Sequence, residues 1–482
     1  MAKFNRPTTG IKTVNLAGGE AYTQTPELEL VSIMLTSFAE DQFYRSFSDQ
    51  TENLKRLLSV CDPKFAAQAA VYARTQFGMR SITHVVASEL AKHITGKKWA
   101  KDFYKAVVYR PDDMTEILSY HFAGKNKETN AMKKGFAMAF NKFDDYALAK
   151  YRGENRNIKL VDVVNLCHPI PSEKNAEAIK GLVEGTLRSK DTWETELTQA
   201  GQKAETEEEK EELKKEVWTK LVETGKIGYF ALLRNLRNIL EQAPEIIPKA
   251  TELLIDEKRI HKSLVLPFRY LTAYKEIQNL SGKGSRELLM ALNTAIDISV
   301  ENVPKFEGDT LVVLDTSGSM TFHTNYKTGR TPAEIGALFS AVLVKSNNAD
   351  FMDFSNHARY QNLNPADSTL TLAHSINFQA GGTNFHSIFQ TANKPYDRII
   401  ILSDQQGWVG YYTPKDVFAG YKRITGANPF VYTFDLQNYG NMQFPEQNVF
   451  CIAGFSEKVF DIMKLLEQDK NALVNTIKQV EF

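Results

Sequence analysis

Two aspartates and three hydroxyl side chains in the last third of the chain are spaced as ligands of a divalent cation. Asp315, Ser317 and Ser319 alternate with other residues, so their side chains can point the same way from an extended loop. Thr383 follows two glycines, and Asp404 comes shortly after an apolar run. Carboxylate and hydroxyl oxygens are hard ligands that suit Mg²⁺ or Mn²⁺. We therefore predict a Mg²⁺ or Mn²⁺ site made of Asp315, Ser317, Ser319, Thr383 and Asp404.

The elements around these residues predict an open α/β sheet. Residues 309–314 and 398–402 are continuous apolar, β-rich runs of the kind found in buried parallel strands. Ligands of such sheets bind at the carboxyl ends of the strands, where Asp315 and Asp404 stand. Alternating strands and helices predict a doubly wound α/β domain over residues 305–482. The further expected strands are 351–354, 429–434 and 449–453, and the expected helices are 332–346, 385–392, 414–421 and 457–467.

The part before residue 304 has a different, helical pattern. Apolar residues recur with a period of 3.6 from Leu28 onward, and Asp62-Pro63 is a typical helix start. Many short helices without alternating strands predict an α-solenoid of HEAT-like repeats over residues 1–304. Residues 1–27 look irregular, and the glutamate-rich residues 201–217 predict a solvated helix or loop. The other helical runs are 98–108, 113–123, 129–140, 159–167, 173–187, 229–240, 247–254 and 284–300.

Charge is distributed unevenly along a chain whose net charge is zero. Residues 1–305 carry 45 Lys plus Arg against 41 Asp plus Glu, and residues 80–168 carry 16 against 10. A local basic surface of this kind can bind phosphates, although a lysine-rich helical surface with no ligand gives the same count. The chain contains no apolar run of the roughly 20 residues that span a bilayer. Three cysteines far apart in sequence and a start without an apolar leader predict a reduced, cytoplasmic protein.

Both parts of the chain resemble known families. The order of the cation ligands and strands in the last part is similar to von Willebrand factor A domains and integrin I-domains. The helical part resembles the TROVE module that telomerase-associated, Ro and vault proteins share. Together the two parts resemble the architecture of Ro proteins. The motifs that carry the TROVE resemblance are residues 15–22, 72–74, 79–84, 109–114, 232–238 and 266–271.

The resemblance implies a monomeric RNA-binding ring. Helical repeats would close into a ring whose hole takes the single-stranded 3′ ends of misfolded RNA, while Y-like small RNA binds the basic outside. Such a protein would act as a scaffold in RNA quality control beside a 3′ exoribonuclease such as polynucleotide phosphorylase, and would not itself be an enzyme. Arginine and lysine bind phosphates without needing sequence. The residues implied on the outer surface are Lys150, Arg152, Arg156 and His168, and those implied in the hole are Arg74, Arg80 and His84.

A second function stays open at the level of sequence. In von Willebrand A-type domains the cation leaves one coordination position for a carboxylate of a partner protein. The chain could therefore be a metal-dependent adhesion or docking module that has no RNA ligand. A metal-dependent enzyme is the weakest option, because no base or nucleophile with a matching partner accompanies the predicted ligands.

Overall fold

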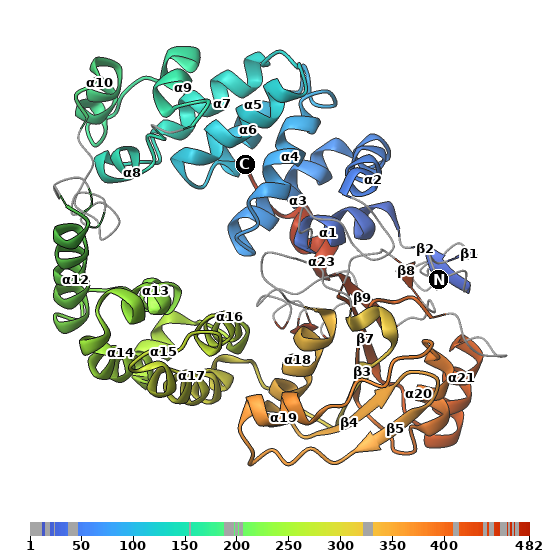
Figure 1. Ribbon diagram of the computed structural model, residues 1–482. Coiled ribbons are helices and arrows are strands. Elements are labelled where there is room, and N and C mark those ends of the chain that lie inside the picture. The colour runs from blue at the N-terminus through green and yellow to red at the C-terminus, as the bar shows by residue number, and fades with distance from the viewer. Residues whose placement is uncertain are drawn as a thin grey trace. The chain divides into compact units, whose positions relative to one another are not determined.

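The computed structural model describes most of the chain and is drawn in Figure 1. Its residues group into two compact units, each of which combines segments far apart in sequence. One unit contains residues 23–190, 438–440 and 452–482, and the other contains 1–22, 191–437 and 441–451. The described residues are 12–14, 20–23, 25–36, 47–153, 156–187, 197, 201, 206–321, 331–407, 414–436, 441–442, 448–453, 460, 463–464, 467 and 472–482.

The first unit consists of packed helices. Helix α3 begins after Asp62, whose side chain accepts a hydrogen bond from the backbone N–H of Phe65 (3.2 Å), as the Asp62-Pro63 pair predicts. Helices α5 and α7 pack closely because Gly135 has no side chain: a Cβ there would lie 2.4 Å from the Lys101 carbonyl oxygen. The helices are α1 (Pro26–Thr36), α2 (Phe47–Val60), α3 (Pro63–Gln76), α4 (Ser81–Leu90), α5 (Ala100–Val107), α6 (Pro111–Ala123), α7 (Asn130–Phe140), α8 (Asp145–Lys150), α9 (Leu160–Cys167), α10 (Ala176–Glu184) and α23 (Ala472–Lys478).

The second unit joins further helices to the α/β domain. Part of the predicted acidic segment forms α12, which begins after Thr206, and residues 202–205 of that segment lie outside the described residues. Phe268 of α16 stacks on Phe339 of α18 with ring centroids 5.4 Å apart, so the helical repeats and the α/β fold share a core here. The helices before the sheet are α12 (Glu207–Glu223), α13 (Tyr229–Gln242), η1 (Pro244–Ile246), α14 (Ile247–Leu254), α15 (Glu257–Ser263), α16 (Pro267–Gln278), α17 (Ser285–Ser299) and η2 (Val300–Asn302).

A six-stranded sheet in the order β5-β4-β3-β6-β7-β9 forms the centre of the α/β domain. Strands β4, β3, β6 and β7 run parallel, with Leu314 of β3 paired to Asp353 of β4 and to Leu402 of β6. Figure 1 shows α18 and α20 on opposite sides of the sheet. The elements are β3 (Thr310–Asp315), η3 (Gly318–Thr321), α18 (Pro332–Ser346), β4 (Ala349–Phe354), β5 (Ala358–Gln361), α19 (Thr369–Ser375), α20 (Phe385–Thr391), β6 (Arg398–Ser403), α21 (Pro414–Thr425), β7 (Phe430–Asp435) and β9 (Val449–Ala453).

Several elements differ from the sequence-based expectation. Strand β5 pairs antiparallel with β4, so the sheet is mixed rather than wholly parallel, and helix α19 was not anticipated. Residues expected to be irregular form β1 (Lys12–Val14) and β2 (Glu20–Thr23), which join β8 (Asn441–Met442) in a small sheet. The short lengths of these elements explain the misses, since so few residues establish no period. The helix expected at 457–467 lies largely outside the described residues.

Two further expectations concern boundaries and membranes. The domain boundary near residue 304 stays a prediction. Each compact unit combines several segments of the chain, so the division into units does not test a single boundary. Among the described residues, no helix has both the length and the apolar character needed to span a membrane.

Candidate RNA interface and cation site

Two adjacent carboxylates at the start of α6 organise a polar cluster in the helical unit. Pro111 occupies the first helical position, where its missing N–H is not needed, and Arg110 precedes it as the N-cap. The Asp113 side chain accepts hydrogen bonds from the backbone N–H groups of Tyr109 and Arg110, both at 2.8 Å. A helix N-terminus favours negative charge. The local sequence thus fixes Asp112 and Asp113 side by side at this end of the helix.

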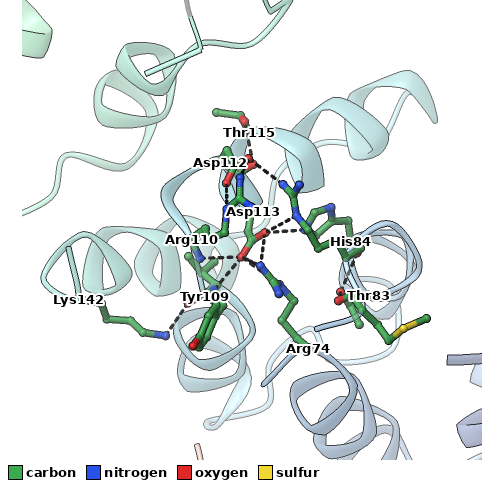
Figure 2. A network of polar contacts seen from close by, with 12 residues as sticks. Arg74, Thr83, His84, Tyr109, Arg110, Asp112, Asp113, Thr115 and Lys142 are labelled. Carbon is green, nitrogen blue, oxygen red and sulfur yellow. Dashed lines mark hydrogen bonds and ion pairs between the residues drawn. The ribbon is translucent and has the colours of Figure 1, made fainter. Parts of the chain in front are cut away.

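Two buried side chains, Arg74 and His84, contact the Asp113 carboxylate. Arg74 of α3 donates from Nε (3.1 Å) and from its terminal nitrogen (2.9 Å) to one Asp113 oxygen, and His84 Nε2 lies 2.9 Å from the other. Figure 2 shows Arg74 and His84 converging on Asp113. Burial by itself raises the pKa of Asp113, but the His84 hydrogen bond and the Arg74 charge outweigh it and hold that pKa well below its usual range.

Three arginines that are partly exposed to solvent lie around the Asp112 carboxylate. Arg80 donates to Asp112 at 2.7 Å, and Arg110 donates two hydrogen bonds at 2.9 and 2.8 Å. An Arg156 nitrogen lies 3.8 Å from the same carboxylate, and Arg156 also pairs with Glu116. The side chains of these three arginines are 36, 33 and 42% exposed, whereas Asp112 is 4% exposed. The buried carboxylate therefore holds a set of guanidinium groups at the surface.

Aromatic rings accompany these cations. The Arg74 guanidinium carbon lies 5.2 Å from the centre of the Tyr109 ring, and that of Arg110 lies 4.3 Å from the centre of the Tyr151 ring. The Lys150 ammonium lies 5.9 Å from the Tyr151 ring. Cations within about 6 Å of a ring are attracted to its face. The Tyr151 ring thus links Arg110, one of the arginines around Asp112, to Lys150 at the end of α8.

The structure places the predicted RNA-contacting residues in three environments. Arg74 and His84 are buried, so in this structure they position Asp113 and do not offer a surface to phosphate. Arg80, Lys150 and Arg156 come together around Asp112, Arg110 and Tyr151, although sequence reasoning assigned them to two different surfaces. The Arg152 guanidinium donates to the Leu187 carbonyl oxygen. His168 is exposed in a left-handed conformation (φ 47°) at the end of α9, the helix that follows Arg156.

Sequence reasoning missed Tyr109, Arg110 and the two aspartates as members of a site. In the sequence analysis, residues 109–114 served only as one of the motifs that resemble the TROVE module. A signal was present in the adjacent carboxylates after Arg110-Pro111, because an arginine at a helix start beside two acids is poised for ion pairing. With Arg74, Arg80 and Arg156, the cluster holds four guanidinium groups against the carboxylates of Asp112, Asp113 and Glu116, and Lys150 adds charge at its edge.

The predicted cation ligands lie at the carboxyl ends of the central strands. Asp315 ends β3, and Asp404 follows the neighbouring parallel strand β6; both side chains are fully buried. The Ser403 hydroxyl donates to Asp315 at 2.6 Å, and the Ser317 backbone N–H donates to its other oxygen at 2.8 Å. The Ser317 and Ser319 hydroxyl oxygens are 3.4 Å apart. Four of the five predicted ligands therefore belong to adjacent segments of one sheet edge.

Backbone hydrogen bonds bring the glycine loop to the same edge. The Ala380 N–H donates to the Thr316 carbonyl oxygen at 3.1 Å, and the Gly318 N–H donates to that of Gly381 at 3.3 Å. Gly381 has φ +93°, a conformation that glycine adopts without strain. The loop leads directly into Thr383, which is 2% exposed.

The donor set fits a divalent cation. One oxygen of Asp404, Oδ2, is buried without a hydrogen-bond partner among the described residues. Burial, followed by the nearby Asp404 charge, raises the pKa of Asp315, and burial raises that of Asp404. Within the described part of the chain, no three His, Cys, Asp or Glu side chains gather as a metal site, so hydroxyl oxygens would have to complete the coordination. Two carboxylates with serine and threonine hydroxyls match the preference of Mg²⁺ and Mn²⁺ for oxygen.

Comparison with known proteins identifies the family. The family model of the TROVE domain matches residues 38–215 and 184–305, which is more than half of the chain. The chain belongs to the TROVE family. TROVE proteins generally bind RNA, so the arginine cluster belongs to a domain of RNA-binding type. This outcome confirms the resemblance inferred from the motifs.

Relatives and a solved structure place the fold. Telomerase protein component 1 of Mus musculus is 23% identical, in a match that covers 54% of this chain and 13% of that protein. The corresponding protein of Rattus norvegicus is 21% identical with the same coverage, so the chain spans only a small part of these relatives. The crystal structure of the Deinococcus radiodurans Ro (RSR) protein superposes with a TM-score of 0.63 at 19% identity, covering 89% of this chain and 97% of that one. The expected fold class, helical repeats with an A-type α/β domain, is confirmed.

Proposed function

We propose that this TROVE protein is a scaffold for structured non-coding RNA. The observation that carries the proposal is the set of three partly exposed arginines fixed on the buried Asp112 carboxylate. Arginine binds phosphate through planar, paired donors, and arginines held in place lose little side-chain freedom on binding. Lys150 extends the cationic surface beside Tyr151. The surface so defined, Arg80, Arg110, Lys150 and Arg156, is called the arginine surface below.

The proposed ligands follow the family. Y-like small RNA would bind the arginine surface through its backbone, with Arg152 and His168 as further contacts. Single-stranded 3′ ends of misfolded RNA would enter the central hole that the sequence resemblance implies. A separate 3′ exoribonuclease, such as polynucleotide phosphorylase, would supply the cleavage in RNA quality control. Binding to phosphates would make affinity strongly dependent on salt.

We also propose that the α/β domain binds Mg²⁺ or Mn²⁺. The support is the Asp404 oxygen that no described residue hydrogen-bonds, beside a second buried carboxylate, because two buried negative charges are costly without a compensating cation. Asp315, Ser317, Ser319, Thr383 and Asp404 would hold the ion, which would offer a position to a carboxylate of a partner protein. The same observation favours the second candidate function, a docking module without RNA. Calorimetric titration of the protein with Mn²⁺ tests this part, and the absence of a saturable site would reject it.

Sequencing the RNA recovered with the purified protein separates the two functions. Abundant small structured RNA supports the scaffold, and its absence supports the docking module. The variant Lys150→Ala with Arg152→Ala should weaken binding of that RNA and lower the slope of log K against log salt by about 0.7–0.9 for each lost phosphate contact. Unchanged affinity in a folded variant would reject the assignment of these two residues.

A further inference from the structure

Tyr109 is an exposed aromatic residue whose backbone belongs to the buried polar network around Asp113. Its side chain is 58% exposed in the short connection between α5 and α6. The residue that follows it, Arg110, is part of the arginine surface. An aromatic ring beside phosphate-binding arginines offers a flat face to a nucleobase.

Two contacts hold the Tyr109 ring in place on its buried side. The Tyr109 backbone N–H donates to the buried Asp113 carboxylate at 2.8 Å, which fixes the start of the side chain. The guanidinium of Arg74 lies 5.2 Å from the ring centre, and Arg74 itself is 3% exposed and bonded to Asp113. Figure 2 shows the ring beside the Arg74 side chain and directed away from Asp113. One side of the ring therefore rests on a buried, immobile cation, and the remainder faces solvent.

The neighbouring Tyr151 has a different arrangement. The Arg110 guanidinium lies 4.3 Å from the centre of its ring, so an arginine already occupies stacking distance there. That contact orients Arg110, which also donates to Asp112. Tyr151 is thus suited to position an arginine, whereas Tyr109 has its stacking surface available to a ligand.

We propose that Tyr109 stacks on an unpaired nucleobase of RNA whose adjacent phosphates lie on the arginine surface. This inference rests on the proposed RNA-binding function and adds a residue that would contact an unpaired base next to the arginine surface, which uninterrupted duplex does not offer. Bases inside a duplex have both faces covered by their neighbours, whereas unpaired bases can stack on an aromatic side chain. Because the buried Arg74 already holds the Tyr109 ring in place, binding of the ligand loses little free energy to ordering that ring.

The test compares base-dependent with base-independent binding. Fluorescence anisotropy would measure the affinity of the full-length protein for a short oligouridylate and for an abasic oligoribonucleotide of the same length. Tyr109→Leu should weaken binding of the oligouridylate at least about fivefold, because one base–aromatic stack is lost. It should leave the abasic ligand unaffected, because the phosphate contacts remain. Tyr109→Phe should retain the affinity of the unsubstituted protein for both ligands.

A matched control lies in the other unit. Phe230 of α13 is 43% exposed and has Arg234 5.9 Å from its ring centre, but no carboxylate among the described residues pairs with Arg234 as Asp113 pairs with Arg74. Phe230→Leu should leave both affinities unchanged. Equal weakening of both ligands by Tyr109→Leu, or loss of oligouridylate binding in Tyr109→Phe, would overturn the stacking role. If the unsubstituted protein binds neither the oligouridylate nor the abasic ligand, the proposed RNA-binding function itself fails.

Discussion

Two pairs of buried aspartates in this protein have contrasting surroundings. Asp112 and Asp113 lie under four arginines and a histidine, and the pKa of Asp113 is lowered although burial alone would raise it. Asp315 and Asp404 lie among serine hydroxyls, and burial together with their mutual charge raises the pKa of Asp315. The same side-chain type at similar burial thus acquires different properties from its neighbours.

The difference indicates where each pair obtains its counter-charge. The Asp112–Asp113 pair is satisfied by the chain itself, so its arginines are fixed in place and can present their remaining donors to an outside anion. One oxygen of the Asp315–Asp404 pair has no hydrogen-bond partner in the described part of the chain, and this pair would obtain its counter-charge from a bound cation. One pair therefore supports the proposed anion-binding surface, and the other forms a candidate cation site.

The largest expected effect is on Mn²⁺ binding, and it compares a predicted cation ligand with a carboxylate that is already paired with an arginine. Asp315→Ala should abolish Mn²⁺ binding in a calorimetric titration, because it removes an anionic oxygen from the site. The control is Asp353→Asn on the neighbouring strand β4, since Asp353 is already paired with Arg359 at 2.9 Å. This control should retain Mn²⁺ binding, and RNA affinity should survive in both variants. Full-strength Mn²⁺ binding by Asp315→Ala would show that the ligand assignment is wrong.

The second prediction concerns stability and a variant that lacks the Asp113 carboxylate. Asp113→Ala should lower the free energy of unfolding by about 3–5 kcal/mol, because it leaves Arg74 buried without its partner. The control Arg237→Ala breaks an exposed pair with Glu241 on α13, which should change stability only slightly because solvent screens such a pair. Denaturant unfolding of both variants measures the difference. Equal effects would mean that the Asp113 network contributes no more than a surface pair.

The third prediction concerns acid. The pKa of Asp113 is lower in the folded than in the unfolded protein, so its stabilising contribution is complete above the usual carboxyl pKa and is lost as pH falls toward the folded value. The unsubstituted protein should therefore lose stability on acidification below about pH 5. Asp113→Asn should be less stable at neutral pH but should show a flatter dependence on pH in thermal unfolding. Parallel pH profiles would contradict this assignment.

The smallest expected effect tests whether an exposed acid restrains the arginine surface. Glu116 pairs with Arg156, and both side chains are about two-fifths exposed. Glu116→Gln should free Arg156, raise RNA affinity modestly and steepen the slope of log K against log salt by at most about 0.9. Glu128→Gln, which breaks a pair with Lys133 on α7, is the control and should change neither. A decrease in affinity for Glu116→Gln would argue against phosphate contact by Arg156.

Much of the fold was predictable because its signals are local. The Asp62-Pro63 start of α3 depends on neighbouring residues, and the expected helix 332–346 agrees with α18, whose start Thr331 and Glu334 cap reciprocally. The central strands were visible as continuous apolar runs. Strand β5 was not, because its four residues pair with β4 through contacts that its sequence does not specify.

The order of the predicted cation ligands could be read from the residue pattern alone, since each follows a recognisable strand or glycine pair and strand ends in a parallel sheet meet at one edge. The residue pattern also determined the family, through motifs spread along the helical part. In contrast, helix packing in the folded chain makes Arg74 and His84 buried partners of Asp113 and lets Arg80 and Arg156 share Asp112. The reason is physical: an ion pair between residues 32 or 44 positions apart depends on how helices pack, and no local pattern of charges records which carboxylate a given arginine will reach.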